Sequence, residues 1–267
     1  MGYSVRPPAV AGRFYPRDAA ELGRLVDDLL DAVAVPAGDA LAPAYVVPHA
    51  GYRYSGPTAA QVYARLRRHA DEIERVVVLG PPHYVPVDGC AVPTTTAWTT
   101  PLGEVTVALD AARALAAAGL TGTDDGPHAP EHSIEVQVPF LQRAVPATPL
   151  LPILVGQSTV DDVVAVVDAA ATDGTVLLCS TDLSHYLDDA SAREQDRRTA
   201  DAVLDLAPER IGPRDACGAY ALRGTVGWAR HRNLHPALLD LCTSADTAGD
   251  PHRVVGYAAF AISVDPS

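Results

Sequence analysis

Val76-Val77-Val78-Leu79-Gly80-Pro81-Pro82-His83 is the stretch that decides the fold: a short aliphatic run that ends in a Gly-Pro turn and a histidine. Two other stretches have the same arrangement of an aliphatic run followed by a histidine. Tyr45-Val46-Val47 leads into Pro48 and His49, and Val176-Leu177-Leu178 leads through Cys179 toward His185. Short apolar runs without alternation are typical of strands buried on both faces, as in a parallel or mixed sheet covered by helices. The sequence therefore predicts an α/β fold.

Helical patterns separate these runs. In residues 18–34 apolar residues recur at steps of three and four, with Asp18 as N-cap and Glu21 at the capping-box position. The same periodicity predicts helices at 58–69, 110–119, 134–144, 158–171, 188–206 and 216–231. Further strands are expected at 150–155, 238–243 and 254–264, and a hairpin or meander within 90–107. No linker divides the 267 residues, so we predict a single domain over residues 1–267.

The charge balance excludes some classes of partner. The chain has 33 acidic and 20 basic residues, a formal charge of −13. Proteins that neutralise nucleic acid phosphates or dock on anionic lipid need a basic surplus, so we expect neither nucleic acid nor membrane as a partner. The N-terminal residues show no secretory signal and no segment reaches the length of a spanning helix, so we expect a cytoplasmic protein.

The four cysteines lie far apart in the sequence, which argues against a disulfide framework or a zinc ribbon. Cys90, Cys179 and Cys242 fall in apolar runs and are interpreted as small buried hydrophobic residues. Cys217 stands apart because it opens a predicted helix, where the helix N-terminus lowers a thiol's pKa and favours the thiolate.

Histidines follow three predicted strand ends. His49, His83 and His185 lie there, and ligands of open α/β sheets bind at the carboxyl ends of strands. A fourth, His132, lies between Glu131 and Ser133 at a predicted helix start. One such histidine is more often structural than functional, but four loops converging on one end of a sheet indicate a site. The remaining histidines lack a companion motif and are interpreted as structural or exposed: His69, His128, His231, His235 and His252.

This set of side chains suits a metal ion. Two imidazoles and one anionic ligand leave open positions on a non-haem iron. Asp182 and Glu131 are candidate third ligands, although each lies close enough to a histidine to orient it instead, and Cys217 is the thiolate alternative. From the residues alone the choice stays open. No GxSxG elbow, GxGxxG or P-loop motif supports a serine hydrolase or a nucleotide-binding protein.

Seven motifs, in order, resemble the Memo family, whose bacterial and archaeal branch is called AmmeMemoRadiSam system protein B. The resemblance runs from about residue 6 to 264 and is carried by VAGRFYP (10–16), PHAGYRYSG (48–56), LGPPH (79–83), EHSIEVQVPFLQ (131–142), LVG (154–156), STDLSHY (180–186) and VGY (255–257). Threonine stands at position 181 where the family usually has serine.

The resemblance implies a fold similar to class III non-haem-iron extradiol dioxygenases: one three-layer α/β/α domain with its site at one end of the central sheet. It also implies a divalent metal, with iron favoured and copper or zinc as alternatives, held by His49, His83 and Cys217.

The same resemblance implies roles for the other polar residues. It makes Asp182 and His185 a catalytic wall of the site, with His132 opposite, and one of these residues a general base. Tyr52, Tyr54 and Glu131 are expected to bind substrate.

Two functions follow from this reading. In the first, the chain is a metal-dependent redox enzyme acting on a small phenolic substrate. In the second, it is a non-catalytic metal-binding module that works with a radical-SAM protein and an AMMECR-like protein, as the system's name suggests. A zinc hydrolase is disfavoured because no HExxH-like frame supplies a carboxylate base.

Overall fold

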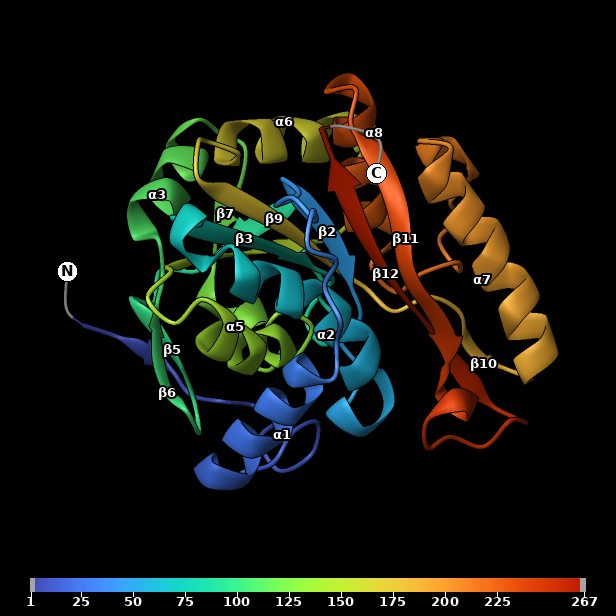
Figure 1. Ribbon diagram of the computed structural model, residues 1–267. Coiled ribbons are helices and arrows are strands. Elements are labelled where there is room, and N and C mark those ends of the chain that lie inside the picture. Colours follow the sequence, from blue (N-terminus) through green and yellow to red (C-terminus); the bar gives the residue numbers. More distant parts are fainter. Residues whose placement is uncertain (1–2, 265–267) are drawn as a thin grey trace.

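The structure, a computed structural model, describes residues 3–264 and is built around a nine-stranded sheet (Figure 1). Its strand order is β10-β12-β2-β9-β3-β8-β4-β7. Strand β11 lies off this path and pairs with residues 256–263 of β12. In that order the strands are His185–Leu187, Val254–Ser263, Ala44–Val47, Thr175–Ser180, Arg75–Gly80, Leu150–Val155, Cys90–Val92 and Gly122–Thr123, and β11 is His235–Thr243.

The sheet is mixed. Its centre, β2, β9, β3 and β8, is parallel, whereas β12 and β4 run antiparallel to their inner neighbours. Successive residues of a strand point to opposite faces, and both faces are buried: Val76 and Val78 belong to one apolar cluster, Val77 and Leu79 to the other. This double burial explains why the strands appear in the sequence as unbroken aliphatic runs and confirms the predicted α/β fold.

Helices cover both faces, which makes three layers (Figure 1). One face is covered by α1 (Ala19–Asp31), α2 (Tyr52–Arg68) and α5 (Val138–Ala144). The other is covered by α3 (Leu109–Ala117), α6 (Val160–Ala170), α7 (Asp189–Leu204) and α8 (Ala219–His231). Short turns complete the set: α4 (Asp125–His128) and the 3₁₀ turns Ala70–Glu72, Glu135–Gln137, Pro208–Arg210 and Ser244–Asp246. Asp18 caps α1 as predicted, accepting the Glu21 N–H at 2.8 Å.

Three segments differ from the sequence prediction. The expected helix at 58–69 begins earlier, at Tyr52, because Pro57 is accommodated inside α2. The segment 134–144 is a 3₁₀ turn followed by α5, whose first turn contains Pro139. Within 90–107, the hairpin of β5 (Ala97–Thr100) and β6 (Gly103–Thr106) joins β1 (Val5–Arg6) in a separate small sheet, while β4 belongs to the main sheet.

The topology brings three loops to one place. Parallel β2, β9 and β3 are neighbours, so their carboxyl ends meet at the same edge of the sheet. Strand β12 pairs with β2 through residues 260–262 and, further along, with β10 through residues 254–255, so it borders the same edge. Among residues 3–264 no helix is long and apolar enough to cross a membrane.

Candidate functional site

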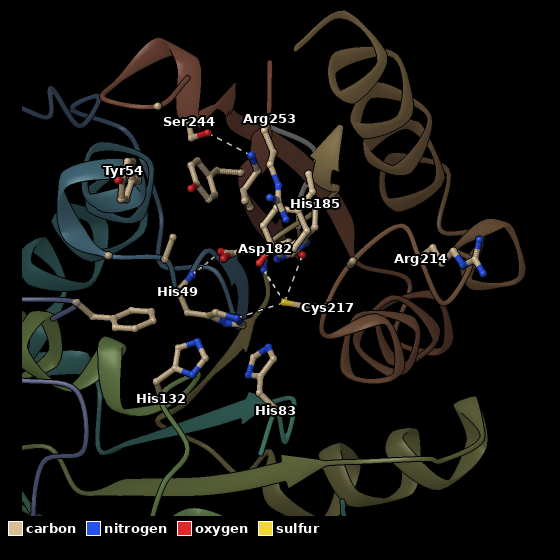
Figure 2. A pocket seen from close by; sticks show the side chains of 18 of the residues that line it. His49, Tyr54, His83, His132, Asp182, His185, Arg214, Cys217, Ser244 and Arg253 are labelled. Carbon is tan, nitrogen blue, oxygen red and sulfur yellow. Dashed lines mark hydrogen bonds between the residues drawn. The ribbon is translucent and has the colours of Figure 1, made fainter. Parts of the chain in front are cut away.

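The carboxyl ends of β2, β9 and β3 open into a cavity of about 860 Å³ (Figure 2). All six residues predicted to bind metal or to act in catalysis line it: His49, His83, His132, Asp182, His185 and Cys217. They come from five separate stretches of the chain, so their meeting is a product of the parallel sheet and its flanking loops.

Three imidazoles form the floor of this cavity. His49, His83 and His132 each offer a ring nitrogen, and these atoms lie within 4.8 Å of one another. The rings of His83 and His132 stack with centroids 4.6 Å apart, and His49 meets both edge-on at 5.3 and 5.5 Å. His132, expected on the opposite wall, is thus part of the same cluster as the two predicted histidine ligands.

The hydrogen bonds around His49 determine which nitrogen faces the cluster. Its Nδ1 lies 2.9 Å from Ser180 Oγ, whose own proton is donated to the Ser133 carbonyl at 2.6 Å, while Gln137 Nε2 donates to the same Oγ at 2.8 Å. Ser180 must therefore accept from His49, so Nδ1 carries the proton and Nε2 presents a lone pair. Burial, and then the neighbouring His132 and His83, lower the pKa of His49 and keep it neutral.

A buried carboxylate orients His83 in the same way. Glu131 Oε1 accepts from His83 Nδ1 and from the backbone amides of His132 and Ser133, each at 2.8 Å, and Oε2 accepts the His83 amide. Although burial alone raises the pKa of Glu131, its contacts with the His132 and His83 side chains and with the Ser133 amide outweigh burial and hold that pKa well below its usual range. Glu131 is 1 % exposed and lies behind His83, outside the lining of the cavity.

Cys217 meets the cluster through His49. Its Sγ lies 3.2 Å from His49 Nε2 and accepts the Asp182 amide at 3.3 Å, while its own amide donates to the Asp182 carbonyl at 3.1 Å. The next residue must be small, because a Cβ on Gly218 would lie 2.9 Å from Thr181. The Thr181 hydroxyl oxygen, Oγ1, accepts the Gly218 amide. Serine, the usual residue of the family at this position, also carries a hydroxyl, so threonine keeps the group that makes this contact.

The expectation of a helix-stabilised thiolate at Cys217 is wrong. Helix α8 begins two residues later, at Ala219, and the Cys217 sulfur is shielded by the loop from Thr181 to Asp182. Burial, followed by the charge of Asp182, raises the pKa of the thiol above its ordinary value. Without a bound cation Cys217 is therefore a thiol that packs against His49.

His185 and Asp182 form the next part of the wall. His185 Nδ1 donates to the Leu183 carbonyl at 2.8 Å, which leaves Nε2 as the acceptor available to the cavity. Asp182 is 5 % exposed; its Oδ1 accepts the His49 amide at 2.8 Å, and burial raises the pKa of its carboxyl. With Nδ1 held by this carbonyl, Nε2 is the nitrogen left for proton transfer.

The two tyrosines predicted to bind substrate lie in different places. Tyr54 lines the cavity. Tyr52 points into the core, where its hydroxyl donates to the Val136 carbonyl at 2.7 Å and its ring packs between Tyr15 and Phe140. Both belong to the first turn of α2, so the early start of this helix sends Tyr52 to the inner face.

Sequence reasoning missed several cavity residues. Phe14, Tyr186 and Tyr257 line it, and all three lie inside motifs that the resemblance identified. Arg253 also lines it, yet it lies next to a turn-rich segment and carries no sequence signal.

Of the histidines interpreted as structural, His128 is buried against Trp98, 3.2 Å from the Ala91 carbonyl, and burial lowers its pKa to about 4.

Comparison with known proteins identifies the family of the chain. The family model described as Memo-like protein matches residues 6–261. The chain is 36 % identical to a MEMO1 family protein of Methanopyrus kandleri, over 96 % of this chain and 98 % of that protein. It is 34 % identical to a MEMO1 family protein of Archaeoglobus fulgidus (97 % and 100 %) and 35 % identical to one of Aquifex aeolicus (95 % and 97 %). The chain belongs to the Memo-like family.

Proposed function

We propose that this protein is a metal-dependent redox enzyme, similar in its chemistry to non-haem iron dioxygenases, that acts on a small phenolic molecule. The observation that carries the proposal is the convergence of His49, His83 and His132 within 4.8 Å at the end of the sheet, with the Cys217 sulfur 3.2 Å from His49. Neutral imidazoles beside a thiol at the floor of a cavity are a donor set for a transition metal.

The side chains fit such an ion. His49 and His83 present Nε2 lone pairs because Ser180 and Glu131 hold their Nδ1 atoms, the arrangement usual for histidine ligands. The Nδ1 of His132 lies 3.2 Å from Glu131 Oε1, so the same carboxylate faces this ring as well. A separation of 3.2 Å between Cys217 Sγ and His49 Nε2 is compatible with both atoms binding one ion, since metal–nitrogen and metal–sulfur bonds measure about 2.1 and 2.3 Å.

His49, His83 and His132 are the donors that the structure brings within 4.8 Å of one another, and the Cys217 sulfur contacts this cluster through His49. His49, His83 and Cys217 would hold the metal, with His132 as the fourth neighbour; iron is favoured, and copper or zinc would suit mixed nitrogen and sulfur donors. A bound cation would supply a Lewis acid with open positions for a substrate oxygen and would convert the Cys217 thiol to the thiolate.

The protein's own side chains would then accept a proton from the substrate and pack against its ring. His185 Nε2 faces the cavity as the acceptor that removes a proton from a phenolic hydroxyl. Phe14 and Tyr54 supply apolar faces against which a ring can pack. Asp182 holds the His49 amide and the Cys217 loop, so it keeps the ligands in register.

Metal analysis of protein purified without added metal tests the site. We expect bound metal in the wild type and a clear loss in His83→Ala and Cys217→Ala. His231→Ala, which removes an exposed histidine at the end of α8, is the matched control and should keep the wild-type content. Equal metal content in all four proteins would remove the cluster from consideration.

Oxygen consumption tests the reaction. Protein loaded anaerobically with iron(II) should take up dioxygen when given a catechol, and His185→Ala should stop uptake while leaving the metal content unchanged. Stoichiometric iron with no oxygen uptake across a broad panel of phenols would contradict the enzyme and favour a non-catalytic metal-binding module.

A further inference from the structure

One wall of the cavity carries an exposed aromatic residue in an unusual conformation. Tyr186 is 63 % exposed and has a φ of 64°, one of three positive-φ residues other than glycine among residues 3–264. It lies at the point where the pairing of β10 with β12 shifts register, between His185 and Leu187. Left-handed backbone is costly for a tyrosine, and this ring gains little burial in return. A role at the surface of the cavity accounts for both features.

The Tyr186 ring supports an arginine. The Arg253 guanidinium lies 4.4 Å from the ring centroid, the geometry of a cation–π contact. Arg253 directly precedes β12, and the bulge in β10 places Tyr186 beside it. Figure 2 shows Arg253 directed into the cavity toward His185, whereas Arg214, another lining residue, points away from it.

Arg253 has a positive charge that the described chain does not neutralise. Within residues 3–264, no carboxylate oxygen lies within 4 Å of its guanidinium, although ten other arginines form ion pairs at that distance. Other arginines among residues 3–264 also form no such ion pair, but of these only Arg214 lines the cavity as well, and it points away (Figure 2). The cationic group is held by an aromatic platform and is free for a ligand.

The deeper wall is lined by aromatic side chains. Phe14, Tyr54 and Tyr257 line the same cavity. A planar ring with a polar end fits such a lining.

We infer that the substrate of this cavity is an aromatic anion, whose carboxylate or phosphate pairs with Arg253 while its phenolic end reaches the imidazole cluster. The inference rests on the proposed function for the phenolic end. The inference of an anionic end depends on Arg253 and Tyr186, which take no part in holding metal.

Calorimetric binding of 3,4-dihydroxybenzoate and its uncharged amide, 3,4-dihydroxybenzamide, tests the inference. A guanidinium pair to a carboxylate should make the acid bind about tenfold or more tightly than the amide. Arg253→Gln should abolish this preference. Arg197→Gln, which removes an exposed arginine of α7 outside the cavity, should retain it.

Each opposite result overturns the inference. Equal affinity of acid and amide for the wild type, no saturable binding of either, or a preference that survives in Arg253→Gln would contradict it. Survival in that variant would mean that the anion binds the metal centre instead. Phenyl phosphate, compared with benzoate, distinguishes a phosphate from a carboxylate as the preferred group.

Repeating the titrations on metal-stripped protein separates this inference from the proposed function. The preference for an anion should persist there, because Arg253 and Tyr186 need no metal. Failure of oxygen uptake would leave the binding result standing, and loss of the Arg253 effect would leave the metal result standing.

Discussion

At the scale of single residues, the decisive property of the site is which nitrogen of each histidine carries a proton. Ser180 and Glu131 settle this for His49 and His83 from behind the rings. Neither residue touches the cavity, yet both determine that it is lined by lone pairs rather than by N–H groups.

Glu131→Gln tests this dependence. The amide keeps the shape of the side chain but removes the charge, and an NH₂ in place of Oε2 cannot accept the His83 backbone N–H that Oε2 now accepts. We expect metal affinity to fall about 10- to 100-fold, measured by competition with a chelator. Glu104→Gln, an exposed change on β6, serves as the control and should have no effect. Unchanged affinity in Glu131→Gln would show that the carboxylate does not support the ligands.

Tyr186→Gly tests whether the left-handed tyrosine is kept for binding. Glycine adopts a φ of 64° without steric cost, which offsets the entropy that it loses on folding. We expect the free energy of unfolding in urea to change by less than about 1 kcal/mol, while the preference for the carboxylate over the amide weakens. A large loss of stability, or unaltered anion binding, would count against a functional role for this ring.

At the scale of elements, helix α7 holds the segment before His185 in place. Asp196 on α7 is 1 % exposed and accepts the Ser184 amide at 2.9 Å, directly before His185. Strand β12 approaches so closely that a Cβ on Gly256 would lie 1.8 Å from Asp196 Oδ2. Gly256 in turn bonds to the Leu183 amide and the Ser184 carbonyl. The position of His185 is therefore set by a helix and a strand that carry none of the proposed metal ligands.

Asp196→Asn tests the protonation of this contact. Burial raises the pKa of Asp196, and its Oδ2 has no partner among residues 3–264. The folded protein thus keeps a proton that the unfolded chain releases above about pH 4, so the associated stability is full below that pH and is lost as the pH rises through the folded pKa. Asparagine imitates the protonated acid. From pH 4 to pH 7, the free energy of unfolding of the wild type should fall relative to the variant; a difference that stays constant with pH would contradict the assignment.

The elements were predicted well where burial alone decides them. Val76–Leu79 and Val176–Leu178 are strands because both of their faces are covered, and an aliphatic run records this directly. The start of α2 was missed because Pro57 usually ends a helix, whereas here it lies within one. The partner of the β5–β6 hairpin, β1, could not be predicted, since strand pairing between residues about 90 positions apart leaves no local signal.

At the scale of the whole molecule, parallel pairing is what assembles the site. His49, His83 and His185 were predicted to meet because each follows a predicted strand, and the parallel order β2-β9-β3 brings those strand ends together. His132 joins the cluster through a loop rather than a strand end, so its place depended on packing that the sequence does not display. Arg253 reaches the cavity only through the register of β12 against β10.

Cobalt(II) titration of metal-stripped protein tests the central claim, a metal centre at His49 and His83 completed by Cys217, most directly. The account predicts one tightly bound ion per chain, with a near-ultraviolet thiolate-to-cobalt absorption band. That band should disappear in Cys217→Ser, and binding should be lost when His49 and His83 are both replaced by alanine. Wild-type protein that binds no cobalt, or a double variant that binds it as tightly as the wild type, would contradict the account.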